Sequence, residues 1–380
     1  MFPPRHKEQD PNAPVRETDN DASLARLSAV QKGYIVDPYV RHFLPLRSQS
    51  QPNRPPLINI GTYVRSESID RLVENWIDLC TNDKTKCQIV SLGAGSDTRF
   101  WRFMTSKYKE NILQYIEVDF PEITTKKAMA IKKNKVLNDI LGGPVSVTRG
   151  GTGLSSPVYH LIAADLRTPS SSPDSVAGLL SPLLDTSKPT LLLFECVLAY
   201  MQPNESSSLI GWFVESFRDS NGGSKAPLGA IVYEMFGLND SFGRVMKANL
   251  KVRNVNIPGA ELYNTVESLP KRFTEPSLGY NFGFAKALTL KDIRKNLPEE
   301  ESSRISQLEM LDEIEELDLV LAHYAITWAA AWPTPDSDVT SSDKREWALK
   351  WADKKLAHPM YHISGEYRAF SWIRSPEELC

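Results

Sequence analysis

Two glycines and two polar residues mark the first stretch with the composition of a ligand site. Gly93 and Gly95 flank a single alanine after the apolar run 88–92, and Asp97 and Thr98 follow them. The run is typical of a buried strand, and the polar pair is typical of the first turn of a helix. Glycine tolerates a positive φ, and its missing Cβ lets a ligand lie directly on the backbone. The pattern predicts a nucleotide-sized site at the carboxyl edge of a parallel sheet.

The chemistry of that ligand is narrowed by what the turn lacks. Position 98 is Thr where the third glycine of a dinucleotide-binding motif would fall, and no P-loop sequence follows. A pyrophosphate cradle is therefore disfavoured, and a ligand that carries adenosine without phosphates fits better. S-adenosylmethionine is the common ligand of that kind. A glycine pair after a strand is also compatible with an ordinary tight turn, so the residues downstream decide between the two interpretations.

Two aspartates follow later strands and offer acceptors for adenosine. Asp119 ends the predicted strand 114–119, and its separation from Gly93 suits an acid that accepts hydrogen bonds from a ribose diol. Asp165 and Leu166 follow the third predicted strand, where a short acid can accept from an adenine amino group while an apolar residue packs on the ring. The competing interpretation of Asp119 as a plain turn residue is weakened by the glycine turn upstream.

Two charged residues interrupt apolar patterns. Glu195 follows the run 190–194, a continuous apolar strand of the kind that is buried on both faces. A carboxylate there needs a partner, which a bound sulfonium or adenosine would supply; the alternative is a surface glutamate at a strand end. Arg65 lies on the apolar face of the predicted helix 61–80. It either extends to solvent or meets an anion in a cleft.

The elements that position these residues follow an α/β pattern. Strand candidates begin near residues 89, 114, 159, 190 and 229, with helical or long crossovers between them. This alternation predicts a doubly wound, mostly parallel sheet with right-handed connections. Elsewhere we predict a disordered tail at 1–20, a helix from Asp21, a flexible insertion at 133–158, a loop at 168–188, short helices and loops at 236–300, a helix ending near Trp332, and an edge strand at 367–373.

Composition narrows the class of protein and its location. The chain has 380 residues, is 41% hydrophobic and carries a formal net charge of −3. It lacks the basic stripe of a nucleic-acid-binding protein and any apolar stretch long enough to span a membrane. The start has no signal-peptide core and the four cysteines form no Cys-x-x-Cys pair, so we expect a cytoplasmic protein. His358 and His362 have metal-ligand spacing, but Pro359 separates them and no third ligand is evident, so we expect no metal.

Together, these motifs resemble one family. The matching segments occur in order between residues 21 and 330, at 21–24, 33–34, 37–39, 61–65, 92–102, 117–121, 164–166, 195–201 and 239–243. They are similar to the leucine carboxyl methyltransferases, which methylate the C-terminal leucine carboxylate of the protein phosphatase 2A catalytic subunit. The combination is far more specific than any single motif.

The resemblance implies a fold, a cofactor and a substrate. The fold would be a class I S-adenosylmethionine-dependent methyltransferase, with a Rossmann-like sheet, an N-terminal helical lid at 21–82 and a methyltransferase domain at 83–380 that carries insertions at 133–158 and 168–188. Tyr200 would lie near the transferred methyl, and Arg65 would anchor one oxygen of the substrate carboxylate. The cofactor residues carried over by position are Arg26, Arg65, Gly93, Gly95, Asp119, Asp165, Leu166 and Glu195.

Two positions depart from the family pattern. Position 26 is Arg where a compared member has Lys, which keeps the charge but alters the donor geometry. Position 241 is Ser where we expect Arg, which bears on contacts to a protein substrate. A leucine carboxylate has a pKa of about 3.5 and is ionised at neutral pH, so no general base is required.

Two alternatives to this function stay open from the sequence. One is an O-methyltransferase that acts on a small-molecule carboxylate. The other is a degenerate fold kept as a non-catalytic phosphatase-binding module. We expect a monomer, because nothing in the sequence indicates a subunit interface.

Overall fold

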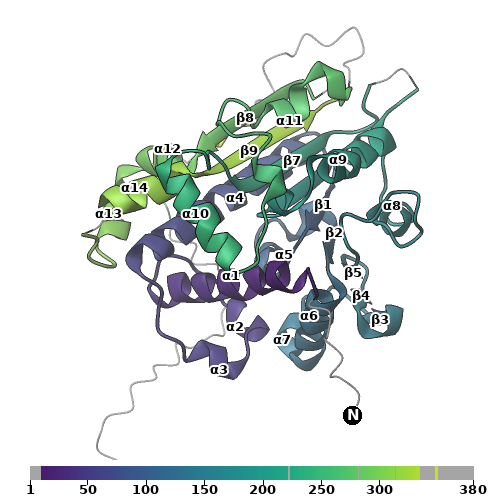
Figure 1. Cartoon of the computed structure of the whole chain (residues 1–380). Helices are drawn as coiled ribbons and strands as arrows, with labels where there is room; N and C mark the ends of the chain where they lie inside the picture. The colour runs from purple at the N-terminus through teal and green to yellow at the C-terminus, as the bar shows by residue number, and fades with distance from the viewer. Residues whose placement is uncertain (1–9, 221–222, 281, 313, 334–346, 350–380) are drawn as a thin grey trace, which may run out of the picture.

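A mixed β-sheet runs through the middle of the protein, with helices on both of its faces (Figure 1). The structure is a computed structural model that describes residues 10–220, 223–280, 282–312, 314–333 and 347–349. Within these residues the sheet has nine strands, in the order β3-β4-β5-β2-β1-β6-β7-β9-β8.

Five adjacent parallel strands form the centre of the sheet. They are β5 (Tyr159–Ala163), β2 (Ile112–Asp119), β1 (Cys87–Leu92), β6 (Thr190–Glu195) and β7 (Leu228–Met235). The five predicted strands and the doubly wound topology are confirmed, since the chain moves outward from β1 in one direction and from β6 in the other. The carboxyl ends of β1 and β6 flank the point where the strand order reverses, which is where open α/β sheets bind ligands.

Antiparallel strands extend one edge of the sheet, and here the sequence prediction is wrong. The strands β3 (Ser146–Thr148) and β4 (Gly153–Ser155) form a hairpin beside β5. The segment 133–158 is therefore not the flexible insertion that its Gly-rich composition predicts. Gly150 and Gly151 have positive φ and occupy the turn of the hairpin, so the glycines mark a tight turn and not a flexible linker.

The other edge also differs from the prediction. The strand β9 (Tyr324–Ala331) lies between β7 and β8 (Phe284–Thr289), both antiparallel to it. The helix predicted to end near Trp332 is present only as α14 (Ile314–Ala322), and the rest of the predicted helix is the strand β9, although alanine is a strong helix former. The strand is buried along nearly its whole length, and burial between two strands overrides that propensity. The edge strand predicted at 367–373 and the pair His358 and His362 lie outside the described residues.

Helices cover both faces of the sheet. Their bounds are α1 (Ala13–Gln31), α2 (Val40–Phe43), α3 (Leu46–Gln49), α4 (Pro56–Asn82), α5 (Arg99–Met104), α6 (Pro121–Lys133), α7 (Lys135–Asp139), α8 (Val176–Leu180), α9 (Pro203–Phe217), α10 (Ser241–Val252), α11 (Lys271–Thr274), α12 (Leu290–Lys295), α13 (Glu299–Ser306) and α14 (Ile314–Ala322). The loop predicted at 168–188 thus contains the short helix α8, whose first turn is capped by the side chain of Ser175.

The first helix begins earlier than its sequence pattern predicts. It starts at Ala13, with Pro14 in its first turn, so the predicted tail at 1–20 is wrong for the residues from 13 onward. Polar residues around the start of α1 make contacts elsewhere in the chain: Asn12, directly before the helix, accepts from Arg167, and Asp19, in its second turn, accepts from Ser96. Such long-range partners stabilise a turn whose composition alone is typical of disorder.

The alternation of side chains along the strands divides the core into two layers. Ile89, Leu191 and Leu193 face one side, where they pack with α4 residues such as Leu72 and Trp76. The intervening residues of the same strands face the other side and pack with α8 and α9. Because both faces are buried, the strands are continuously apolar, as expected of a parallel sheet.

A segment near the end of the described chain is pinned to α4. Trp347 is fully buried, and its indole N–H donates to the carbonyl of Leu72 at 3.0 Å. Its ring centroid lies 4.9 Å from that of Trp76, and its own carbonyl accepts from the indole of Trp328 at 2.9 Å. Residue 347 therefore joins the inner face of α4 to the strand β9.

Candidate active site

The glycine turn after β1 has the geometry that its sequence predicts. Gly93 has φ of +70°, and a Cβ there would lie 2.4 Å from Cγ2 of Val197. Gly95 has φ of +52°, and a Cβ there would lie 2.5 Å from Oδ1 of Asp19. Both positions therefore require glycine for conformation and for space. The turn keeps backbone atoms accessible at the carboxyl end of β1.

Asp119 is buried at the end of β2 and faces this turn. Its Oδ2 accepts the N–H of Gly95 at 2.7 Å, and its Oδ1 accepts the N–H of Phe120 at 2.7 Å. A carboxylate has about four lone-pair sites, so one acceptor stays on each oxygen. Burial raises the pKa of Asp119 to about 6, although the two N–H donors oppose that rise. The residue can accept from a pair of neighbouring hydroxyls, as a ribose diol presents.

Asp165 and Leu166 follow β5 at the same edge of the sheet. Leu166 is half-buried against the core layer that contains α8 and α9. Burial alone would raise the pKa of Asp165, but hydrogen bonds from Arg167 outweigh burial and lower it, so the carboxylate is ionised at neutral pH. The predicted adenine acceptor is thus present as an anion.

Arg65 and Glu195 meet across the site. Nε of Arg65 in α4 donates to Oε1 of Glu195 at 2.6 Å, and the two side chains are 24% and 19% exposed. Nη2 of Arg99 lies 3.4 Å from the other oxygen of Glu195. Burial would raise the pKa of Glu195, but the two arginines outweigh burial and hold it below its usual value. The sequence left open whether Arg65 extends to solvent or meets an anion. In this structure it meets an anion, which is the carboxylate of Glu195.

Tyr200 lies beside this ion pair, in a short turn after β6. The turn begins with Cys196, whose φ of +58° is a strained conformation for a residue other than glycine. Burial raises the pKa of Tyr200, and Arg65 is close enough to oppose that rise. The hydroxyl therefore stays protonated at neutral pH and can donate a hydrogen bond. Its side chain also contacts Thr18 of α1.

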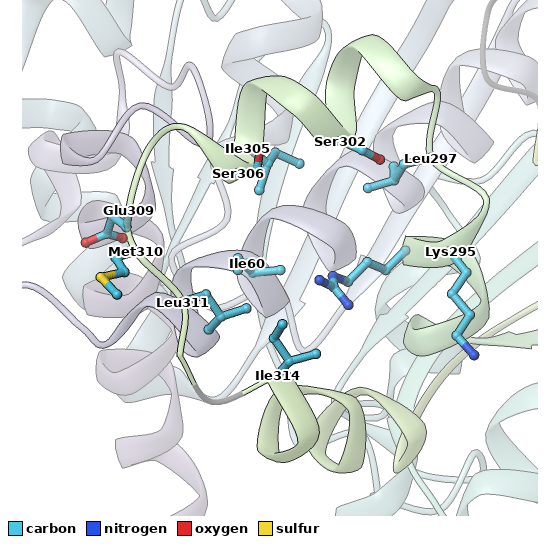
Figure 2. A pocket seen from close by; sticks show the side chains of 11 residues that line it. Ile60, Lys295, Leu297, Ser302, Ile305, Ser306, Glu309, Met310, Leu311 and Ile314 are labelled. Carbon is cyan, nitrogen blue, oxygen red and sulfur yellow. The ribbon is translucent and has the colours of Figure 1, made fainter.

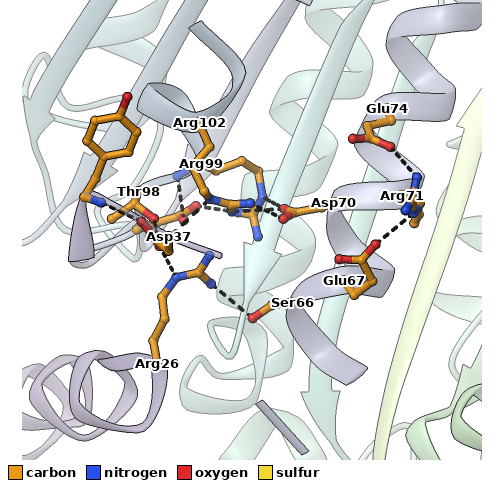
Figure 3. A network of polar contacts seen from close by, with 12 residues as sticks. Arg26, Asp37, Ser66, Glu67, Asp70, Arg71, Glu74, Thr98, Arg99 and Arg102 are labelled. Atoms are coloured by element: carbon orange, nitrogen blue, oxygen red, sulfur yellow. Dashed lines mark hydrogen bonds and ion pairs between the residues drawn. The ribbon is translucent and has the colours of Figure 1, made fainter. Parts of the chain in front are cut away.

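Arg26 is one member of a polar network that also contains Asp37, Asp70, Arg99 and Arg102 (Figure 3). Its Nε donates to Asp37 at 2.5 Å and its Nη1 donates to Ser66 at 3.1 Å. Asp37 in turn accepts the hydroxyl of Thr98, which ties α1 to the start of α5. Nη2 of Arg26 is buried and makes no hydrogen bond with the described residues. Such an orphaned cationic donor is costly unless a ligand supplies the acceptor.

Arg99 extends the network toward Glu195. It is 1% exposed, donates to Asp70 of α4 at 2.7 Å, and also binds Asp97 of the turn. Arg102 binds the same Asp70 (Figure 3). Three carboxylates from three different elements therefore contact one guanidinium, so α4, the glycine turn and the end of β6 are held in fixed relation.

Sequence reasoning missed four residues that contact the predicted site. Asp19 accepts from the N–H and the hydroxyl of Ser96 at 2.7 and 2.9 Å. The others are Arg99, Arg167 and Tyr233, whose ring lies 4.5 Å from the guanidinium of Arg65. Each of the four has a partner far away in the sequence, and periodicity gives no signal for such pairs.

A cavity of about 550 Å³ lies elsewhere, between α4 and the helices α12, α13 and α14 (Figure 2). Its walls contain none of the predicted site residues. Among the helices that the structure describes, none is both long and apolar enough to cross a membrane.

Known proteins resemble this chain over most of its length. The sequence model of the leucine carboxyl methyltransferases matches residues 15–214. Leucine carboxyl methyltransferase 1 of Cryptococcus neoformans var. neoformans serotype D (strain JEC21) is 45% identical over 358 residues, which cover 86% of this chain and 97% of the relative. The protein of the same name from Schizosaccharomyces pombe is 38% identical and covers 83% of this chain and 94% of the relative. The chain belongs to the leucine carboxyl methyltransferase family.

The resemblance derived from the motifs is thereby confirmed. The protein is a member of the leucine carboxyl methyltransferase family with a class I fold, and its cofactor is S-adenosylmethionine. Among solved structures, a putative methyltransferase from Thermobifida fusca is 12% identical, with a TM-score of 0.44, and the match covers 82% of this chain and 94% of that chain.

The residues at the strand ends fit this cofactor chemically. Asp119 keeps two acceptors for a diol, and Nη2 of Arg26 in α1, which has no acceptor among the described residues, can donate to an anion such as an amino-acid carboxylate. At Gly93 and Gly95 the side chains of Val197 and Asp19 pack directly on the backbone of the turn, at positions where a Cβ would collide. The assignment of the individual cofactor residues stays a prediction.

Proposed function

We propose that this family member transfers a methyl group from S-adenosylmethionine to the α-carboxylate of the C-terminal leucine of the protein phosphatase 2A catalytic subunit. The product would be a methyl ester, which removes the negative charge of the chain end and thereby regulates holoenzyme assembly. The observation that carries the proposal is the partly exposed guanidinium of Arg65, held at the carboxyl end of β6 by Glu195.

Arg65 is placed to hold a second carboxylate. Its Nε is bound to Glu195, and the described residues make no hydrogen bond to its two terminal nitrogens. Arginine presents its donors in a rigid fork, so these nitrogens can bind one oxygen of an incoming carboxylate by a charge-assisted bond. Burial would lower the pKa of Arg65, but Glu195 outweighs it and raises the pKa, so the group stays cationic.

Positioning is the main task left to the protein. The bound cofactor supplies an electrophilic methyl on a sulfonium. A leucine carboxylate is already the nucleophile at neutral pH, so no residue has to remove a proton. Arg65 would fix one carboxylate oxygen, the protonated hydroxyl of Tyr200 would orient the group, and the half-buried site would limit hydration of the attacking oxygen.

The experiment that tests the proposal compares acceptors. The full chain would be incubated with S-adenosylmethionine carrying a tritiated methyl and with the intact phosphatase catalytic subunit, the same subunit lacking its terminal leucine, or free small carboxylic acids. We expect label only on the intact subunit, released by mild base as an ester would be. Label on small acids alone would favour a small-molecule methyltransferase, and cofactor binding without any label would contradict the proposal.

A further inference from the structure

Arg167 lies two residues beyond the predicted adenine acceptor and has no part in the proposed methyl transfer. Its Nε donates to Oδ1 of Asp165 at 2.8 Å, and its Nη2 donates to Oδ2 at 2.6 Å. The backbone N–H of Arg167 adds a third bond to Oδ1 at 3.0 Å. Two parallel charge-assisted bonds and one backbone bond therefore fix the plane of the Asp165 carboxylate.

The acceptors of Asp165 are nearly used up by these bonds. A carboxylate offers about four lone-pair sites, two on each oxygen. Oδ1 receives two N–H groups and Oδ2 receives one, all from Arg167. One acceptor site is left, on Oδ2. Because the side chain of Asp165 is 33% exposed, a ligand can reach this site with a single N–H donor.

The same guanidinium contacts two other parts of the site. Nη2 of Arg167 also donates to the side-chain oxygen of Asn12, directly before α1, at 2.8 Å. The central carbon of this guanidinium, Cζ, lies 5.5 Å from the ring centroid of Phe120, the residue after the predicted diol acceptor Asp119. Arg167 therefore joins the end of β5, the end of β2 and the first turn of α1.

We propose that Arg167 is a specificity-determining positioning residue: it fixes Asp165 so that a single acceptor receives the amino group of adenine, and its bond to Asn12 ties α1 over the same ligand. This rests on the cofactor position predicted for the strand ends. A purine with an oxo group in place of the amino group presents an acceptor to Oδ2 of Asp165. The two oxygens then face each other with no hydrogen between them. A site built to hydrogen-bond one partner rejects such an analogue strongly.

The test uses binding and needs no methyl acceptor. Isothermal titration calorimetry of the full chain would compare S-adenosylhomocysteine with its 6-oxo analogue, S-inosylhomocysteine. For the wild type we expect the amino compound to bind at least about 100-fold more tightly. In Arg167→Met the affinity for the amino compound should fall about tenfold, and the preference for it should narrow by at least as much.

Two variants separate geometry from charge. Arg167→Lys keeps the cation but loses the fork, so it should recover less than half of the lost preference on a logarithmic scale. Asn12→Ala keeps the pair with Asp165, so the preference should be unchanged while the ligand dissociates faster. The matched control is Arg149→Met, which removes an arginine from an exposed pair with Asp174 and should change neither quantity.

Three results would overturn the inference. These are a wild type that binds both purines equally, an Arg167→Met variant that weakens both to the same extent, or an Arg167→Lys variant that restores the full preference. An unchanged dissociation rate in Asn12→Ala would overturn the role of the α1 contact. Failure of methyl transfer to the phosphatase, with the purine preference intact, would instead contradict only the proposed acceptor.

Discussion

Nε of Arg65 lies 2.6 Å from Oε1 of Glu195, and this bond joins the helix α4 to the carboxyl end of β6. The pair is partly buried, and Arg99 supports its acidic partner from the other side. Glu195 therefore keeps Arg65 at the strand end while leaving the terminal nitrogens of its guanidinium for a ligand.

Loss of Arg65 should reduce catalysis far more than it reduces folding. In Arg65→Ala we expect kcat/KM for methyl transfer to fall about 100- to 1,000-fold, because one charged donor to the reacting carboxylate is lost. The control is Arg71→Ala on the same helix; within the described part of the chain Arg71 forms ion pairs with Glu67 and Glu74 alone, so this variant should retain activity.

A double variant separates charge burial from catalysis. Arg65→Ala leaves a partly buried carboxylate with one partner fewer, whereas Arg65→Met combined with Glu195→Gln removes both charges. We expect the double variant to unfold at a higher temperature than Arg65→Ala and to stay inactive. Recovery of activity in the double variant would contradict the role given to Arg65.

Cofactor affinity should depend on the protonation of Asp119. Its pKa is raised to about 6, so the carboxylate that accepts the diol is lost as the pH falls through 6. Binding of S-adenosylhomocysteine should weaken below that pH, by up to about tenfold per pH unit. A raised pKa also means that protonation of this group favours the folded state, so acid unfolding through Asp119 cannot produce the effect.

Two variants test the assignment of this pH dependence. Asp119→Asn should bind weakly and show no step near pH 6. Glu117→Gln should keep the step, although burial raises the pKa of Glu117 to about 7 and the residue lies on the same strand. A step that vanishes in Glu117→Gln and persists in Asp119→Asn would contradict the prediction.

Gly93 should tolerate alanine less well than a glycine with similar φ elsewhere. Gly150 has φ of +67° with nothing within 4 Å of an added Cβ, so Gly150→Ala should cost only the conformational penalty of about 1 kcal/mol. Gly93→Ala adds a collision with Val197 and should cost more in the free energy of unfolding, measured with urea. Adding Val197→Ala should recover part of the excess; equal costs at the two glycines would be inconsistent with the geometry.

Removal of the Trp347 side chain, which is distant from α4 in the sequence but packs on it, should destabilise that helix. Trp347→Ala deletes a fully buried ring that packs on Trp76, and we expect a loss of about 3–5 kcal/mol in the free energy of unfolding. Trp347→Phe keeps most of the packing and loses the bond to Leu72, so its loss should be about 1–2 kcal/mol. An unchanged denaturation midpoint in Trp347→Ala would show that the residue does not stabilise the helix.

The sheet and the acidic strand ends could be predicted from the sequence. Asp119, Asp165 and Glu195 each follow an apolar run, and parallel strands place such residues at one edge of the sheet by topology alone. The role of the glycines at 93 and 95 could likewise be predicted, because a tight turn after a strand needs residues that adopt positive φ, as both do.

The parts that could not be predicted depend on partners distant in the sequence. The start of α1 is polar and is stabilised through Asn12, directly before the helix, and Asp19, in its second turn, whose partners lie in other elements. The alanine-rich β9 becomes a strand because β7 and β8 enclose it, which its own residues do not encode. Arg99 binds acidic residues from α4, the glycine turn and β6. Its role could not be predicted from the sequence, because only the fold brings these three segments together.

The most direct test of the proposed function is the position of the transferred methyl. The phosphatase 2A catalytic subunit would be incubated with S-adenosylmethionine and either the wild type or Arg65→Ala, and its C-terminal peptide would be analysed by tandem mass spectrometry. The account predicts one added methyl on the terminal leucine carboxylate with the wild type, removed by mild base, and little or none with the variant. A methyl on any other residue, or equal methylation by Arg65→Ala, would contradict it.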